Sequence, residues 1–85
     1  MDRVDLEMAV DGVPYFVKAT PFQLNGDMQY QVAINEGSEV TFVFDPDLGR
    51  YAPVGDAAVN VPDNLEIEIG TKLNNDSLRN NGGPR

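Results

Sequence analysis

Apolar and polar residues alternate through two neighbouring runs near the start of the chain, residues 3–10 and 13–19. Such alternation places every second side chain on the same face of a β-strand. Asp11-Gly12 separates the two runs, and this pair is typical of a two-residue type I′ turn, in which both residues need a positive φ. The turn brings apolar residues together as Val10 with Val13, Met8 with Tyr15, Leu6 with Val17, and Val4 with Ala19. We therefore predict a β-hairpin with one apolar face, and Asp5 opposite Lys18 on the other face.

Asn25-Gly26 gives the same turn signal further along the chain. A two-residue loop at this point pairs Ala19 with Val32, so the apolar faces of the second and third strands match as well. Pro21 interrupts the second strand, and its missing N–H predicts a bulge or a local break there.

Residues 28–44 alternate on both sides of a third turn, Glu36-Gly37-Ser38. A three-residue loop with Gly37 in the left-handed region keeps the apolar faces together, whereas a two-residue loop would turn one face over. The longer loop predicts the pairs Ile34 with Val40, Val32 with Phe42, and Tyr30 with Phe44.

The next segment contains the residue types of a turn at 45–49, with Pro46 and Gly49 at positions that need their special φ values. Residues 50–54 predict a short fifth strand, which Pro53 would confine to the edge of the sheet.

Residues 63–73 fit two interpretations. Leu65, Ile69 and Leu73 have the spacing of one helix face, but the segment also alternates apolar and acidic residues like a strand, and Gly70 is unfavourable inside a helix. We favour a helix because the apolar face of the sheet needs a cover and no other segment remains to provide one.

The predicted fold is therefore α+β: an antiparallel four- to five-stranded β-meander curved around one C-terminal helix. Residues 1–73 would form a single compact domain. Residues 74–85 have one apolar side chain and no periodicity, which predicts a disordered tail.

The composition excludes several kinds of chemistry. The chain has no cysteine and no histidine, so it offers no disulfide, no thiolate nucleophile and none of the commonest transition-metal ligands. Its 14 acidic and 6 basic residues give a net charge of −8, which argues against direct binding to nucleic acid through the phosphates. This charge would suit a basic protein partner.

No motif in the sequence indicates a catalytic or cofactor site. Asp45 and Asp47 resemble the start of a calcium loop, but the following residues, Gly49 to Tyr51, do not continue the ligand spacing. No phosphate-binding motif is present. We therefore expect a non-catalytic protein without a metal or cofactor.

The chain shows neither a signal peptide nor an apolar run of the ~20 residues that a membrane span requires. We expect a soluble cytoplasmic protein that does not bind membranes. Charged residues on the first strand and proline near the last disfavour open-ended strand pairing, which predicts a monomer or a closed dimer.

The second face of the sheet carries the candidate binding residues. Alternation places Phe16, Phe22 and Val43 there, with Phe22 beside Gln29 and Val43 beside Gln31. Partly exposed apolar residues on a polar face can mark a partner surface. Phe16 would lie apart, because it precedes Phe22 by six residues on the same strand. We interpret these residues as the contact surface of a protein-interaction or structural module.

The alternative is an acidic inhibitor or nucleic-acid mimic that occupies a basic groove of another protein. Carboxylates along one surface would then imitate phosphates. The candidates are Asp5, Glu7, Asp27, Glu39, Asp45, Asp47 and Asp56.

Overall fold

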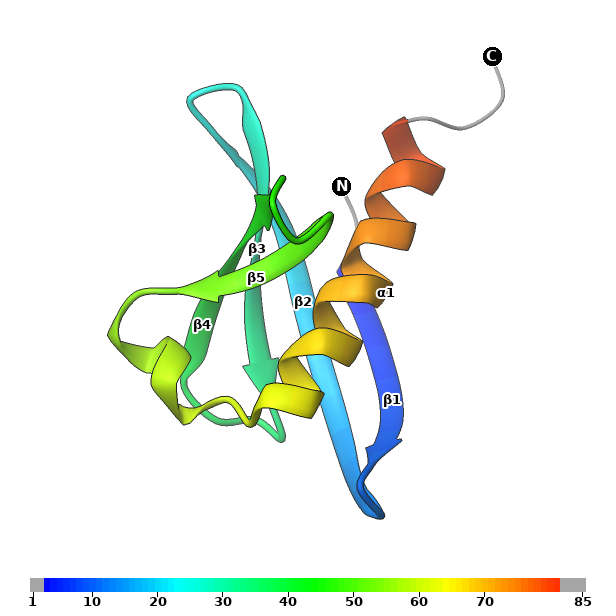
Figure 1. The fold of residues 1–85 in the computed structure, drawn as a ribbon. Coiled ribbons are helices and arrows are strands. Elements are labelled where there is room, and N and C mark those ends of the chain that lie inside the picture. Colours follow the sequence, from blue (N-terminus) through cyan, green and yellow to red (C-terminus); the bar gives the residue numbers. More distant parts are fainter. Residues whose placement is uncertain (1–2, 82–85) are drawn as a thin grey trace.

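A computed structural model describes residues 3–81 and contains five antiparallel strands followed by two helical segments (Figure 1). The elements are β1 (Val4–Val10), β2 (Val13–Leu24), β3 (Asp27–Ile34), β4 (Glu39–Asp45), β5 (Arg50–Val54), the 3-10 helix η1 (Asp56–Asn60) and α1 (Asp63–Asn81). The strands are neighbours in chain order, β1-β2-β3-β4-β5. The predicted α+β meander with a C-terminal helix is confirmed.

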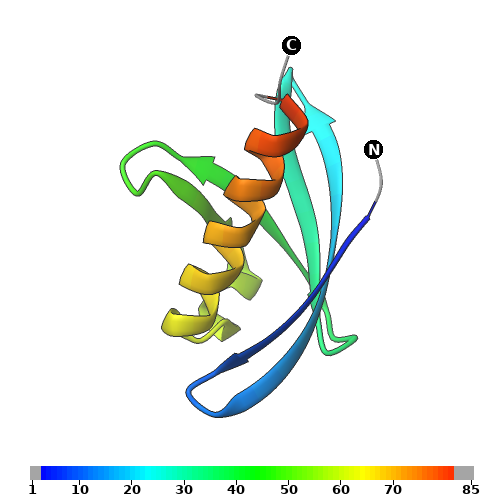
Figure 2. The same cartoon turned by 90° about the vertical axis from the view of Figure 1, so that its right-hand side faces the viewer.

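The sheet curls into a half-barrel, and α1 lies along its concave side (Figures 1 and 2). β1 and β5 form the two edges of the half-barrel. The helix packs mainly against β5 and touches β1 little. Within residues 3–81, no helix has both the length and the apolar content that crossing a bilayer requires.

The first two hairpins have the predicted registers. Val10 pairs with Val13 and Asp5 with Lys18 in the β1–β2 hairpin, and Ala19 pairs with Val32 between β2 and β3. Both turns have positive φ at their two central residues. The first central residue, Asp11 in one turn and Asn25 in the other, has a φ of 54°. The turn residues thus set the pairing, as their chemistry indicated.

The predicted bulge or break at Pro21 is wrong, because β2 continues through this residue and pairs it with Tyr30. An inner strand directs its N–H groups alternately to its two neighbours. Phe16 bonds to Asn35 on the β3 side, so the nitrogen of Pro21, five residues later, faces the β1 side. The β1–β2 pairing ends at Ala19, and Pro21 therefore interrupts no described ladder bond.

The β3–β4 turn differs from the prediction. Asn35 and Glu36 are its left-handed residues, with φ of 50° and 62°, and Gly37 is not left-handed. The Gly37 N–H donates to the Ile34 carbonyl at 2.9 Å and closes the turn. Ser38 has no partner of its own on β3 and forms a bulge, after which the regular β3–β4 pairing begins at Glu39.

The predicted β3–β4 register is consequently wrong by two residues: Val32 pairs with Val40, and Tyr30 with Phe42. A shift of two keeps the same faces together, so the apolar face is preserved. Asn35 explains the shift, since its N–H donates to the Phe16 carbonyl at 2.7 Å and its Oδ1 accepts from the Phe16 N–H at 2.8 Å. Held against β2, Asn35 must begin the turn, and asparagine tolerates the left-handed conformation.

The core fills the space between the concave face of the sheet and α1. Its largest fully buried side chains are Tyr30, Phe42, Leu65, Ile69, Leu73, Val17 and Val32. The three helix residues in this set have the spacing that predicted the helix. Each fully buried aliphatic or aromatic side chain contributes roughly 1.5–3 kcal/mol to folding.

The helix continues beyond the predicted end at residue 73 and includes residues 74–81, which were predicted to lie in the tail. Asp76 in this extension is buried and accepts a hydrogen bond from the Tyr30 hydroxyl at 2.9 Å. A polar contact therefore docks this part of the helix, where an apolar pattern is missing. Residues 82–85 of the predicted tail lie outside the described residues.

Gly70 determines how closely α1 approaches β5. A Cβ at this position would overlap the backbone carbonyl oxygen of Tyr51. Glu66 lies one turn earlier on the same side of the helix, with Oε2 3.8 Å from the Arg50 guanidinium. The glycine that disfavoured a helix in the sequence is what allows this helix to contact the strand.

Candidate functional site

The convex side of the half-barrel carries one row of side chains that runs across four strands. The strand registers place Phe22 opposite Gln29, Gln29 opposite Val43, and Val43 opposite Ala52. The predicted position of Phe22 beside Gln29 is confirmed, but Val43 lies beside Gln29 and not Gln31. Phe22 and Val43 thus flank one glutamine, two strand spacings or ~10 Å apart.

Two further apolar residues lie on this face. Leu24 is 51% exposed, and Val54, which pairs with Thr41, is 44% exposed. Phe22 and Val43 are themselves partly buried. We call Phe22, Leu24, Val43 and Val54 the outer-face patch. Strand alternation alone assigns Leu24 and Val54 to this face, so the signal for them was present in the sequence.

Phe16 lies apart from the outer-face patch. It is opposite Glu7 of β1, near the other end of β2, and the Lys18 ammonium is 5.5 Å from its ring centre. A shallow concavity of about 670 Å³ surrounds it, with Glu7, Pro14 and Asn35 in its lining. The structure therefore brings two of the three predicted contact residues together and leaves the third separate.

Polar residues surround the outer-face patch. Gln31 and Thr41 are hydrogen-bonded to each other on the row next to Val43. Asp27 and Asp45 lie toward the end of the sheet where the β2–β3 and β4–β5 turns are. The face therefore has an apolar centre with an acidic border at one end, an arrangement common in protein–protein interfaces.

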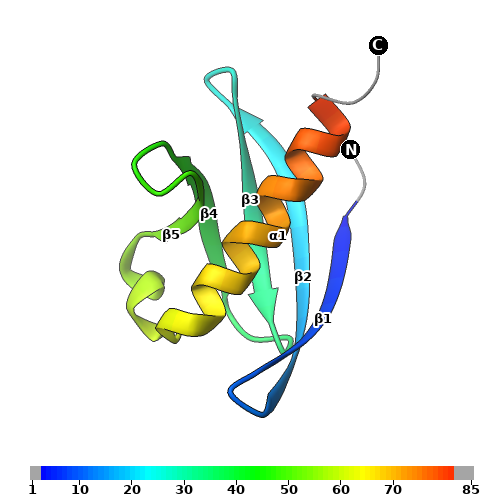
Figure 3. The ribbon, with the colours of Figure 1, turned by 45° about the vertical axis from the view of Figure 1, so that its right-hand side comes forward.

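A cleft opens beside the patch, where β3 and β4 separate. Their pairing ends at Gln29 and Val43, although β3 begins at Asp27 and β4 continues to Asp45. Figure 3 shows the β2–β3 and β4–β5 turns as two separate projections at this end of the molecule. The cleft encloses about 340 Å³ and is lined by Asp27, Met28, Gln29, Val43, Phe44 and Tyr51. We call it the splay cleft.

Two aromatic residues, Phe44 and Tyr51, line the splay cleft. Phe44 is 45% exposed, and its ring centre lies 5.7 Å from that of the buried Tyr51, at an interplanar angle of 74°. Tyr51 contacts Tyr30 in the same edge-to-face way, with ring centres 5.1 Å apart. Phe44 is thus the accessible end of a series of edge-to-face ring contacts that begins in the core.

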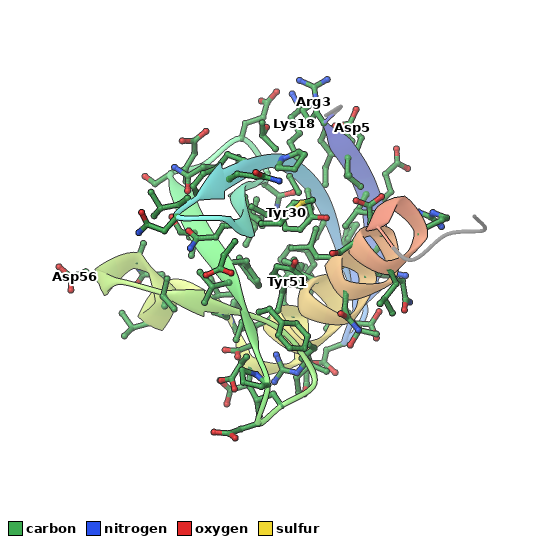
Figure 4. The ribbon with its side chains drawn as sticks, turned by 90° about the horizontal axis from the view of Figure 1, so that it is seen from above. Arg3, Asp5, Lys18, Tyr30, Tyr51 and Asp56 are labelled. Carbon is green, nitrogen blue, oxygen red and sulfur yellow. The ribbon has the colours of Figure 1, made fainter. Side chains whose placement is uncertain are left out.

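The hydroxyl groups of Tyr30 and Tyr51, behind these rings, are hydrogen-bonded to residues of α1. Figure 4 shows Tyr30 and Tyr51 pointing into the space between sheet and helix. Burial and the hydrogen bond to Asp76 raise the pKa of the Tyr30 hydroxyl well above its ordinary value. The Tyr51 hydroxyl lies 3.3 Å from that of Ser77. These bonds attach the last turns of α1 to the sheet, which is a structural role.

A third concavity, of about 460 Å³, lies at the opposite end of the half-barrel. Its lining includes the core residues Val40, Val61 and Leu65, together with uncharged residues of the β3–β4 turn. It has the apolar walls of a small-molecule pocket but offers no charged group to orient a ligand.

The acidic residues do not form a metal centre in the described part of the chain, where no three of them are grouped to hold an ion. Asp45 and Asp47, which resembled the start of a calcium loop, belong to a turn. The Asp45 carboxylate accepts the Asp47 N–H at 2.9 Å, and Gly49 follows with φ of 69°. This geometry agrees with the turn chemistry of the sequence.

Comparison with known proteins found no matching family model, no matching curated protein and no matching solved structure.

Proposed function

We propose that this protein is a non-catalytic interaction module that binds a basic protein through the outer-face patch. The observation that carries the proposal is the row across β2, β3, β4 and β5, which gathers Phe22 and Val43 around Gln29 on a regular sheet face. Leu24 and Val54 extend the apolar surface in two directions and are about half exposed. A rigid sheet presents such residues with little loss of conformational freedom on binding.

The charge of the protein supports a basic partner. The net charge is −8, and Asp27, Glu39 and Asp45 lie on the same face as the patch by strand alternation. Opposite charge on the partner would accelerate encounter and orient it, while the apolar centre would supply most of the affinity.

The alternative function, an acidic mimic, has weaker support because the candidate carboxylates are dispersed. Asp5 is paired with Arg3, with Nε and Oδ1 2.9 Å apart, and Asp45 stabilises a turn. Figure 4 shows Asp5 and Asp56 on widely separated parts of the molecule. A mimic of phosphates needs a continuous line of free carboxylates.

The proposal is tested by comparing the proteins captured from a lysate of the native host by wild-type protein and by two variants, Leu24→Ser and Val54→Ser. Both residues are about half exposed, so the substitutions should leave the fold intact, as circular dichroism and urea unfolding would verify. We expect at least one captured basic protein to be lost with both variants. Its purified form should bind them more weakly by about 2 kcal/mol, roughly thirtyfold, in calorimetry.

Val59→Ser is the matched control, because Val59 is 85% exposed but lies on η1 and not on a strand of the sheet. This variant should capture the same partner as wild type. If the patch variants retain every captured protein, or if Val59→Ser loses the same partner, the outer-face patch is not the binding surface. The expectations of a cytoplasmic location and of a monomer or closed dimer stay predictions.

A further inference from the structure

We propose that the splay cleft binds one arginine side chain of the basic partner. This inference rests on the proposed function, because the cleft and the outer-face patch are continuous. Val43 belongs to the patch and also lines the cleft, and Gln29 lies beside both. A partner seated on the patch would therefore have part of its surface directly over the cleft.

The lining of the cleft suits a long side chain with a cationic end. Met28, Phe44 and Tyr51 line the cleft and offer apolar surface for an aliphatic stem. Its volume of about 340 Å³ is at the lower end of the range for binding pockets, which favours a single side chain over a larger ligand. An aromatic ring at an exposed site attracts a cation through its electron-rich face.

Asp27 supplies a carboxylate at the border of the cleft. It is exposed, and within residues 3–81 it takes part in no side-chain hydrogen bond or ion pair, in contrast to Asp5, Glu36 and Glu66, which have basic partners. A carboxylate with no internal partner beside an aromatic ring is free to pair with an incoming cation.

The strand registers show where the cleft opens. Continuing the β3–β4 register by two residues would set Asp27 opposite Asp45 and Met28 opposite Phe44. Like charges directly opposite each other destabilise strand pairing, and here the pairing stops before this position is reached. A cation inserted between the strands would lie beside Asp27, the acidic residue of the cleft lining, whereas Asp45 accepts a hydrogen bond within its own turn and lies opposite Arg50.

Arginine fits this site better than lysine. The guanidinium group is planar and weakly hydrated, stacks on aromatic rings and pairs with carboxylates through two N–H donors. The lysine ammonium is compact and strongly hydrated, so it gives up more hydration on entering a partly apolar cleft.

The test uses ¹⁵N-labelled full-length protein and the peptide acetyl-Gly-Arg-Gly-amide, followed by NMR. The matched probe replaces arginine with citrulline, which has nearly the same shape and no charge. We expect the arginine peptide to shift the backbone amides of residues 27–29 and 43–44. The citrulline peptide and a lysine peptide should each bind at least about threefold more weakly, because they lose the charge or the stacking guanidinium.

Two substitutions then separate the contributions within the cleft. Asp27→Asn removes one charge with little change in shape, and Phe44→Ala removes the exposed ring. Each should weaken arginine binding about two- to fivefold. Asp56→Asn is the matched control, since it removes the same charge from an exposed position on η1 and should leave binding unchanged.

Equal effects of Asp27→Asn and Asp56→Asn, or amide shifts spread over all acidic regions, would identify non-specific attraction and overturn the inference. Equal binding of the lysine or citrulline peptide would also overturn it. If arginine fails to bind while partner capture still depends on Leu24 and Val54, only the cleft assignment fails. If capture does not depend on those residues, the proposed function fails whatever the peptide does.

Discussion

The hydroxyl of Tyr30 connects the centre of the sheet to the last turns of the helix. Its side chain is fully buried and donates to Asp76 at 2.9 Å, and Asp76 also lies 3.4 Å from the Arg79 guanidinium. A hydrogen bond between a neutral donor and a carboxylate in the protein interior is stronger than one between two neutral groups. This bond therefore determines where a helix end of largely polar sequence docks.

Tyr30→Phe should lower the free energy of unfolding by about 1.5–3 kcal/mol, since it removes a buried hydrogen bond to a charged group while the ring is retained. Urea unfolding at neutral pH measures the change. Tyr15→Phe is the control, because Tyr15 is only partly buried and its hydroxyl makes no hydrogen bond within the described chain. A loss of equal size in both variants would contradict the role assigned to the Tyr30–Asp76 bond.

The same group should make stability depend on alkaline pH. An unfolded tyrosine has a pKa of about 10, and burial raises the pKa of Tyr30 above that value. Above pH ~10 the unfolded state therefore releases the proton that the folded state retains, and stability falls by up to about 1.4 kcal/mol per pH unit from this group. The difference in unfolding free energy between wild type and Tyr30→Phe should shrink between pH 9 and 11, whereas a constant difference would contradict the raised pKa.

At the scale of elements, two backbone positions fix how the parts meet. Gly70 lets α1 contact the carbonyl of Tyr51, and Asn35 anchors the β3–β4 turn to Phe16. At both residues, a contact with a distant part of the chain determines the structure, and the local conformational preference of the residue does not.

Gly70→Ala should destabilise the protein by more than about 1 kcal/mol, because the added methyl group would force the helix away from β5. Helix propensity alone predicts the opposite, a gain of about 1 kcal/mol. Thermal unfolding decides between the two. Thr71→Ala, at the next and exposed helix position, should follow propensity and be neutral or slightly stabilising.

Glu36→Gly should stabilise the protein by about 0.5–1 kcal/mol, since Glu36 has φ of 62° and a left-handed conformation is unfavourable for any side chain of this kind. The substitution also produces the Asn-Gly pair that a type I′ turn prefers. Ser38→Gly, which replaces a residue without positive φ, should not stabilise. The urea midpoints of both variants test this prediction. A loss of stability in Glu36→Gly would show that the 3.9 Å contact between Glu36 and Lys18 contributes more to stability than the relief of the left-handed conformation.

Much of the element order could be predicted from the sequence, because strand alternation and two-residue turns are local signals. The β3–β4 register could not, since it depends on two hydrogen bonds between Asn35 and Phe16, nineteen positions apart. The helix end was missed for a similar reason: Asp76 is buried by a tyrosine from β3 rather than by an apolar pattern. Alternation in the sequence placed Phe22 and Val43 on one face. The splay cleft could not be predicted, because it lies where the β3–β4 pairing ends and no local sequence pattern indicates that end.

At the scale of the whole molecule, α1 contacts the two edge strands of the half-barrel unequally. The helix packs on β5 at one edge, while β1 at the other edge is held mainly by its pairing with β2. β3 lies in the middle of the sheet and carries the fully buried Tyr30 and Val32. Local stability should therefore decrease from the centre of the sheet toward β1.

Native-state hydrogen exchange measured by NMR tests this gradient. The ladder amides of β3 should exchange only through global unfolding, while those of β1 should exchange faster by opening of the first hairpin. Tyr30→Phe should bring the two rates closer by lowering the global free energy alone. Equal protection of β1 and β3 in wild type would mean that the sheet opens as one unit.

The position of α1 after all five strands has a consequence for synthesis. The concave face of the sheet stays uncovered until the ribosome has made residues 63–81, so a nascent chain that already contains the strands exposes its apolar side to other molecules. Transiently exposed apolar surface promotes aggregation. Premature stop codons between β5 and α1 would therefore yield a fragment that precipitates or requires chaperones.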